Sequence, residues 1–287
     1  MKRARAQKIL SLTCIVIAAA VAFAVTGYLD KAFAAGSKTI YVIDGQYEIS
    51  VSKENRERSY KYNKKGLLTG EVEHFHKYSK PNMKFKYNKK NRLVRIDYKN
   101  GSWKLIEKYA YTKGGKLKSR TYKSTGSGSP FTIYDRYTCN KAGLPVKVIQ
   151  TDKREVWTYN YSYNKKGRLV RKYQHYINYD ATYNREISYL YTYKYDKKGN
   201  LKSSTTKDPS DPRAGGTVYY KNTYKKGRLV KIVTKSRSDV TGKWETSPPL
   251  IYTYKKIKVP KKMVPQIKKQ QWAILNWNQN AALGSID

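Results

Sequence analysis

The sequence predicts an all-β fold: a long antiparallel meander of β-hairpin repeats, curled into a barrel-like or spiral shell and followed by a short C-terminal cap of helix-permitting composition. Three observations predict it. One line rich in tyrosine and lysine recurs about eight times along the chain. Its Tyr-x-Tyr pattern places both rings on one face of a strand, because strand side chains alternate with period two. Gly, Asn and Asp also interrupt the chain too often for long helices.

Residues 1–34 have the pattern of an export signal. Residues 1–8 carry four positive charges, residues 9–29 carry no charge, and Ala32–Ala34 offers the small residues that a signal peptidase reads. An uncleaved anchor is the alternative, because this uncharged stretch of 21 residues is just long enough to span a bilayer. Both interpretations place the rest of the chain outside the cytoplasm, secreted or associated with the cell wall. After cleavage no transmembrane span is expected.

The composition limits the kinds of partner. The chain has 60 basic and 20 acidic residues, and without residues 1–34 its formal charge is +36. So large a surplus opposes self-association, which predicts a monomer, and attracts polyanions. Outside a cell these are anionic wall polymers, acidic glycans, lipid headgroups and released nucleic acid, the last bound only nonspecifically. The 29 tyrosines exclude a merely disordered basic tail, and Cys139, the one cysteine beyond residue 34, leaves no intramolecular disulfide.

Residues 35–259 form the predicted repeat domain. Its glycine column recurs every 24 to 32 residues, about the span of two strands and two turns. The column consists of Gly66, Asn91, Gly115, Gly143, Gly167, Gly199 and Gly227. Asn-Lys-Lys-Gly predicts a type I turn closed by a residue in the left-handed region, the three-residue hairpin with a bulge. Asn91 fits this column because Asn tolerates positive φ best among the other residues.

That turn sets the strand register. It places the Tyr before the Asn opposite the Leu two positions after the Gly: Tyr62 with Leu68, Tyr87 with Leu93, Tyr111 with Leu117, Tyr163 with Leu169 and Tyr195 with Leu201. It places six aliphatic residues on the other face: Val94, Ile96, Val146, Val148, Val230 and Ile232. A four-residue loop would swap the faces, and the sequence leaves this open. About sixteen strands are too many for a flat open sheet, which favours a barrel or a spiral.

The line Tyr-x-Tyr-Asn/Asp-Lys-Lys-Gly-Arg-Leu resembles the YD repeat of the Rhs and wall-associated protein families of secreted and surface proteins. The resemblance covers most of residues 60–259 and is carried by Tyr161, Tyr163, Asn164, Gly167, Arg168, Leu169 and their counterparts. It implies a spiralling β-sheet shell, in some members enclosing a toxin, with repeats that are often labelled carbohydrate-binding. The Asp that names the repeat is kept only at Asp196, and no variable toxin domain follows, which argues against an enclosed passenger.

The turn lysines are the main candidate site. In a meander the repeat turns share one edge of the sheet, and each repeat advances about 10 Å along it. The predicted polyanion-binding residues are Lys64, Lys65, Lys89, Lys90, Lys165, Lys166, Arg168, Lys197, Lys198, Lys225, Lys226 and Arg228. The competing interpretation is that exposed lysines only deter edge-to-edge aggregation.

Aromatic and catalytic candidates are fewer. Trp103, Trp157 and Trp244 lie outside the tyrosine columns and are the candidates for stacking on a glycan, although packing is the alternative role. His74 and His76 share a strand face but lack a third metal ligand, and Cys139 has no placed base. The sequence therefore predicts no catalytic residues, no metal and no cofactor. A pair of glycosidase carboxylates stays open, because the two groups need only be close in space.

Residues 260–287 form the predicted C-terminal cap or tail. Pro260 and Pro265 end the strand pattern, and residues 266–283 have a helix-permitting composition with Trp272, Ile274, Leu275 and Trp277 clustered. We expect this segment to cap the sheet or plug its concavity, because repeat folds need their exposed ends covered. Contact with a membrane surface is the alternative.

These patterns predict a secreted, non-enzymatic repeat protein that binds an anionic cell-wall polymer or an acidic glycan at the cell surface. Two functions of other classes remain as alternatives. One is an extracellular glycan hydrolase. The other is a scaffold or shell for another exported protein, such as a toxin.

Overall fold

The computed structural model describes residues 36–50, 53–74, 82–126, 130–152, 154–179, 185–211, 215–237 and 242–281. Within these ranges seventeen strands form one antiparallel sheet, and a 3-10 turn and one α-helix follow it. The predicted signal at residues 1–34 lies outside the described ranges and stays a prediction, and His76 lies outside them as well. No helix within the described ranges combines the length and the apolar character needed to cross a membrane.

The strands follow the repeats in chain order. They are β1 (Ser37–Ser50), β2 (Lys53–Tyr62), β3 (Leu68–Glu73), β4 (Met83–Tyr87), β5 (Leu93–Asn100), β6 (Trp103–Tyr111), β7 (Leu117–Thr125), β8 (Phe131–Cys139), β9 (Pro145–Thr151), β10 (Glu155–Tyr163), β11 (Leu169–Asn178), β12 (Arg185–Tyr195), β13 (Leu201–Lys207), β14 (Gly215–Lys225), β15 (Arg228–Arg237), β16 (Trp244–Thr246) and β17 (Leu250–Pro260). The 3-10 turn Lys261–Met263 then leads into helix α2, Val264–Ala281.

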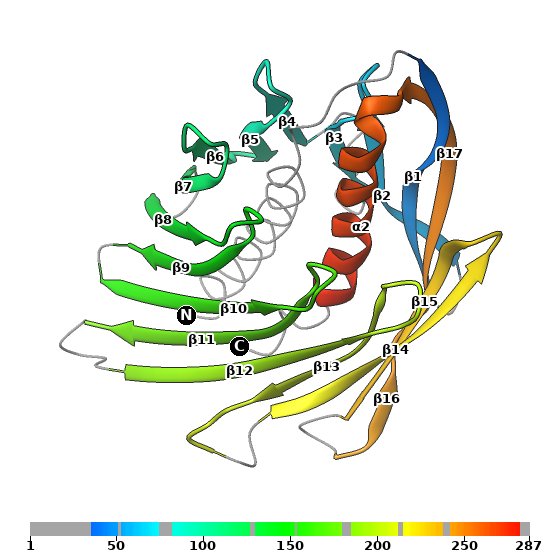
Figure 1. Ribbon diagram of the computed structural model, residues 1–287. Helices are drawn as coiled ribbons and strands as arrows, with labels where there is room; N and C mark the ends of the chain where they lie inside the picture. Colours follow the sequence, from blue (N-terminus) through cyan, green and yellow to red (C-terminus); the bar gives the residue numbers. More distant parts are fainter. Residues whose placement is uncertain are drawn as a thin grey trace.

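The sheet closes on itself (Figure 1). Consecutive strands pair from β1 to β15, and β17 pairs with both β15 and β1. Strand β16 pairs only with β15 among the described strands, so the other sixteen of the seventeen form the ring. Between β16 and β17 stand Ser247, Pro248 and Pro249, and proline cannot donate to a β-ladder. The predicted meander of hairpins is confirmed, and the shell is a closed barrel rather than an open spiral.

The predicted hairpin register is also confirmed. The five expected Tyr–Leu pairs face each other, each beside a bulge. Gly66 has φ 79° and Asn91 has φ 58°, the left-handed values that the turn requires. The β14–β15 hairpin differs because it is one residue shorter. Lys225 pairs directly with Arg228, and Lys226 and Gly227 both have positive φ, which makes a two-residue type I′ turn.

The prediction for the second face was wrong for Ile96, Val148 and Ile232. These three side chains are buried, and Ile96 and Ile232 belong to the same core cluster as the Leu of their own turns. The cause is the bulge, which inserts one extra residue after that Leu and so reverses the alternation of faces further along the strand. Val94, Val146 and Val230 are half-buried.

The interior is a core of Tyr, Leu and Ile side chains, and helix α2 lies within it (Figure 1). Ile274 joins the main core cluster, and Ile267 packs in a second one with Val42, Leu67 and Val259. The helix is also tied to well-separated strands. Gln271 accepts a hydrogen bond from the Ile43 N–H at 2.6 Å, and the indole of Trp272 donates to the Gly199 carbonyl at 3.0 Å. The C-terminal segment therefore fills the inside of the barrel; the side chain of Trp277 lies outside the described part.

Candidate polyanion-binding rim

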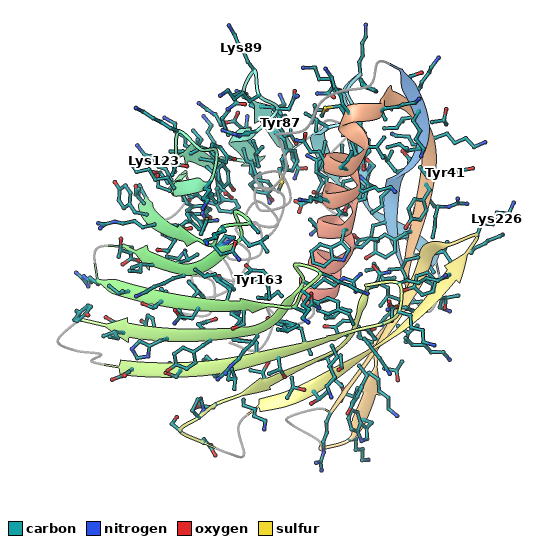
Figure 2. All side chains as sticks on the ribbon, in the orientation of Figure 1. Tyr41, Tyr87, Lys89, Lys123, Tyr163 and Lys226 are labelled. Atoms are coloured by element: carbon teal, nitrogen blue, oxygen red, sulfur yellow. The ribbon has the colours of Figure 1, made fainter. Side chains whose placement is uncertain are left out.

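The repeat turns all lie at one end of the barrel. Each of the seven connects an even-numbered strand to the next odd-numbered one, and in a closed antiparallel meander such turns share an end. Ten of the predicted lysines are exposed there, and we call these ten the lysine rim: Lys64, Lys65, Lys89, Lys90, Lys165, Lys166, Lys197, Lys198, Lys225 and Lys226. Figure 2 shows Lys89 and Lys226 projecting away from α2 into solvent.

The Asn of the repeat fixes the backbone that carries three of the five lysine pairs, and Asp196 does so for Lys197 and Lys198. Asn63 Oδ1 accepts hydrogen bonds from the backbone N–H groups of Lys65, at 2.9 Å, and Leu67, at 3.1 Å. Asn88 and Asn164 bind their own turns in the same way. This is the side-chain-to-backbone bonding that makes Asn a turn former. The sequence placed Asn in the turn correctly but did not predict these bonds.

The tyrosine of most repeats ties its hairpin to the backbone of the preceding one, whereas Tyr224 donates to the Asp196 side chain. The Tyr87 hydroxyl donates to the Leu68 carbonyl at 2.7 Å, and the Tyr163 hydroxyl donates to the Pro145 carbonyl at 2.8 Å. Tyr62, Tyr111, Tyr195 and Tyr254 make the equivalent bond, and Cys139 donates from its thiol to the Leu117 carbonyl. Burial raises the pKa of Tyr87 and Tyr163, so both hydroxyls stay protonated donors. These bonds hold neighbouring lysine pairs in fixed relation around the rim.

The predicted arginines are placed differently from the lysines. Arg168 and Arg228 are half-buried. The guanidinium of Arg168 lies 5.8 Å from the ring centre of Tyr195, and that of Arg228 lies 4.0 Å from the ring centre of Tyr41. A Cβ at Gly199 would come within 2.1 Å of the Arg168 guanidinium. Gly199 thus adopts the left-handed conformation that the turn requires, and its lack of a side chain leaves room for the arginine beside the Tyr195 ring.

The predicted tryptophans do not lie together. Trp103 packs against the core cluster and donates to Ser124 at 2.6 Å. Trp157 lies on the inner face, with its ring centre 4.2 Å from that of Tyr176. Only Trp244 among the three is exposed, at 51%. The inward placement of Trp103 and Trp157 is what packing predicts, and it removes them from any outer glycan surface.

Acidic side chains of the barrel interior do not neutralise the positive charge of the lysine rim. Glu71, Glu73, Glu107 and Asp135 are buried. Arg58 contacts Glu71 at 2.9 Å, and Arg120 contacts Asp135 at 2.6 Å. Burial raises the pKa of Glu71 and of Glu107 to about 7, although the neighbouring arginines oppose that rise. These carboxyl groups are therefore withdrawn from the surface, where basic residues dominate.

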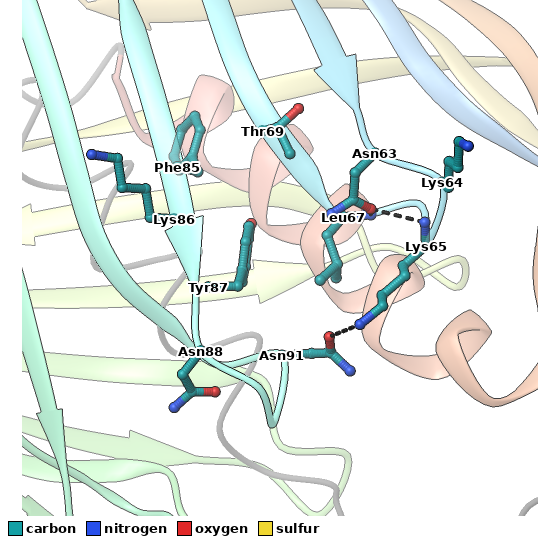
Figure 3. Close-up of a pocket in the computed structure, with 10 residues that line it drawn as sticks. All are labelled: Asn63, Lys64, Lys65, Leu67, Thr69, Phe85, Lys86, Tyr87, Asn88 and Asn91. Carbon is teal, nitrogen blue, oxygen red and sulfur yellow. Dashed lines mark hydrogen bonds between the residues drawn. The ribbon is translucent and has the colours of Figure 1, made fainter.

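A pocket of about 550 Å³ opens between the β2–β3 and β4–β5 turns (Figure 3). Three lysines line it, Lys64, Lys65 and Lys86, together with asparagine, Thr69 and aromatic side chains. Lys65 Nζ donates to Asn91 Oδ1 at 3.1 Å across the pocket. Cations and amides around an open hollow provide donors for an anionic group.

The described residues contain no group of three His, Cys, Asp or Glu side chains placed to hold a metal ion. His74 bonds to the Ser59 hydroxyl at 2.9 Å. Cys139 is half-buried, and burial raises the pKa of its thiol, which is the opposite of what activates a nucleophile.

Comparisons with known proteins give a fold but no family. No family model matches the chain, and no curated protein matches it. A porin-like protein from Bacteroides vulgatus matches with a TM-score of 0.50 and 9% identity, over 74% of this chain and 98% of that one. A porin-like protein from Bacteroides uniformis matches with a TM-score of 0.26 and 13% identity, over 56% of this chain and 94% of that one. TcdB2-TccC3 without its hypervariable C-terminal region matches with a TM-score of 0.23 and 12% identity, over 71% of this chain and 14% of that one.

The resemblance to the YD-repeat and Rhs families was wrong as a family assignment. No model of such a family matches, and a structure similar at the level of the whole fold is that of a porin-like protein. The physical reason is that the repeated line encodes a hairpin: a tyrosine, an Asn-capped turn, a left-handed glycine and a leucine suit any antiparallel sheet. The chain shares a closed antiparallel barrel with the porin-like protein from Bacteroides vulgatus.

Proposed function

We propose that the protein works at the cell surface as a non-catalytic barrel that binds an anionic wall polymer or an acidic glycan through the lysine rim. One observation carries the proposal: barrel closure gathers five exposed lysine pairs, separated by up to 162 positions in sequence (Lys64 to Lys226), at one end of the molecule. Side-chain and backbone hydrogen bonds order the turns that carry the pairs, so little conformational freedom of the backbone is lost on binding.

The spacing of the pairs suits a long, flexible ligand. Adjacent repeats stand about 10 Å apart, and charges are screened over about 8 Å at physiological salt. Each pair therefore acts nearly independently on the nearest anionic group. A polymer that touches several pairs gains avidity, because every contact after the first is intramolecular.

The outer wall of the barrel favours an aqueous location over a lipid one. Exposed lysines alternate along strands β4–β7 at Lys84, Lys86, Lys99, Lys104, Lys108, Lys118 and Lys123. A lysine facing lipid near the bilayer midplane costs about 2–4 kcal/mol. Like charges also face each other across strands, Lys99 opposite Lys104, an arrangement that water screens and lipid does not.

The test is retention of the purified protein on cell walls with and without teichoic acid, across a salt series. The rim variant replaces Lys165, Lys166, Lys197 and Lys198 by Gln. The matched control replaces Lys84, Lys99, Lys118 and Lys123 by Gln and removes the same charge from the outer wall. We expect teichoic acid removal and salt to release the protein, and the rim variant to bind about tenfold more weakly or worse. If the two variants lose the same amount of binding, net charge alone explains the retention and the lysine rim is not a site. If neither variant changes the retention, the proposal is wrong.

A further inference from the structure

The outer wall carries an aromatic pair that the fold does not use. Five large hydrophobic side chains are exposed within the described residues: Tyr41, Tyr134, Tyr179, Tyr219 and Trp244. Tyr219 and Trp244 lie next to each other, with ring centres 5.8 Å apart and planes inclined at 50°. Each is about half exposed, at 49% and 51%. Leaving such rings in water forgoes about 1.5–3 kcal/mol for each side chain that would otherwise be fully buried.

The register of three strands places a cation beside these rings. Tyr219 of β14 faces Lys235 of β15, and Lys235 faces Thr246 of β16. Trp244 lies two residues from Thr246 on the same face of β16, opposite Arg237. The ammonium group of Lys235 lies 5.3 Å from the Trp244 ring centre. Lys221 and Arg237 are exposed as well, so the surroundings of the pair are basic.

We propose that Tyr219, Trp244 and Lys235 form a second binding site for an acidic sugar polymer such as a polyuronate. The two rings offer an apolar surface for the C–H face of a sugar ring, and Lys235 with Arg237 binds its carboxylate by charge-assisted hydrogen bonds. A polymer with charge but no sugar ring, such as polyphosphate, gains nothing from the rings. A neutral polysaccharide gains nothing from the cations.

This site is separate from the lysine rim. Tyr219 precedes Lys225 by six residues along β14, which is about 20 Å of extended strand. A ligand on the rings therefore does not need the turn lysines. The inference shares only the class of ligand with the proposed function and stands if the rim fails.

Binding of polygalacturonate, polyphosphate and dextran to the full-length protein tests the inference. We expect Trp244→Ala and Tyr219→Ala to weaken polygalacturonate binding about tenfold each and to leave polyphosphate binding within about twofold. Lys235→Gln should weaken polygalacturonate binding in the same way. Trp244→Phe keeps an aromatic ring and should lose less polygalacturonate binding than Trp244→Ala. Dextran binds at least about tenfold more weakly than polygalacturonate to the unaltered protein.

Tyr134→Ala is the matched control, because Tyr134 is similarly exposed, at 54%, on β8. This variant should bind all three ligands as the unaltered protein does. The inference is overturned if Trp244→Ala and Tyr219→Ala bind polygalacturonate as the unaltered protein does, or if polyphosphate binding falls by the same factor. The rim variant tests whether the two sites are separate. If it loses polyphosphate binding, while Trp244→Ala still weakens polygalacturonate binding when it is added to the rim variant, both sites exist.

Discussion

Each hairpin of the barrel has two halves that follow different rules. Beside the turn, the same Tyr, Asn, Gly and Leu recur and make the same bonds in most repeats, the shorter β14–β15 hairpin being an exception. Away from the turn the inward side chains change from hairpin to hairpin: a charged cluster of Glu107, Arg120 and Asp135 on β6–β8, but the tilted, contacting rings of Trp157 and Tyr176 on β10–β11. The repeated half sets register and closure, and the variable half fills a barrel whose contents differ around its circumference.

The largest stability effect is expected in the variable half, from Arg120→Met. Arg120 is buried and binds Asp135 at 2.6 Å, with Glu107 3.5 Å away. Removing one partner of a buried ion pair leaves the other charge uncompensated and costs about 3–5 kcal/mol. Arg95→Met is the matched control, because Arg95 binds Asp97 at 2.7 Å on the outer wall, and such solvent-accessible pairs contribute about 0–1 kcal/mol. Urea unfolding measures both, and similar losses would contradict the contrast between buried and exposed pairs.

The same cluster predicts how stability depends on pH. Burial raises the pKa of Glu107 from 4.5 to about 7. Between these values the folded protein holds a proton that the unfolded chain has released, so the free energy of unfolding falls as pH rises through this window. Each unit of pKa difference corresponds to about 1.4 kcal/mol. Glu107→Gln removes this titration, so its unfolding free energy should fall less steeply from pH 5 to pH 7. An unchanged slope would show that Glu107 is ionised in the folded state.

Substitutions at two glycines of the repeated half distinguish the cost of a left-handed backbone from the cost of displacing a packed side chain. Gly199 has φ 90°, and a Cβ added to it would clash with the Arg168 guanidinium. Gly227 has φ 78°, and a Cβ added to it would meet none of the described residues within 4 Å. A left-handed alanine costs about 1–2 kcal/mol, and displacing Arg168 from Tyr195 adds about 0.5–1 kcal/mol. We therefore expect Gly199→Ala to destabilise more than Gly227→Ala in thermal or urea unfolding. Equal losses would mean that Arg168 moves aside without cost.

The sequence predicted the repeated half well, because local patterns determine it. The Tyr62–Leu68 type of pairing and the left-handed Asn91 follow from turn chemistry alone. Ile96 was assigned to the wrong face because a bulge shifts alternation by one residue without a mark in the composition. Arg120 with Asp135, or Tyr219 beside Trp244, come together only through the pairing of strands from different hairpins. No spacing rule reveals such contacts.

The tyrosine hydroxyls of the repeated half give the smallest predicted effect. Tyr163→Phe keeps the ring and its pairing with Leu169 but removes the bond to the Pro145 carbonyl. A lost hydrogen bond of this kind costs about 1 kcal/mol. Tyr134→Phe, at an exposed position of the outer wall, should change the free energy of unfolding by less than about 0.5 kcal/mol. If urea unfolding finds no difference between the two variants, the ring of hydroxyl–carbonyl bonds contributes nothing to closure, and the leucine and tyrosine packing alone holds the hairpins in register.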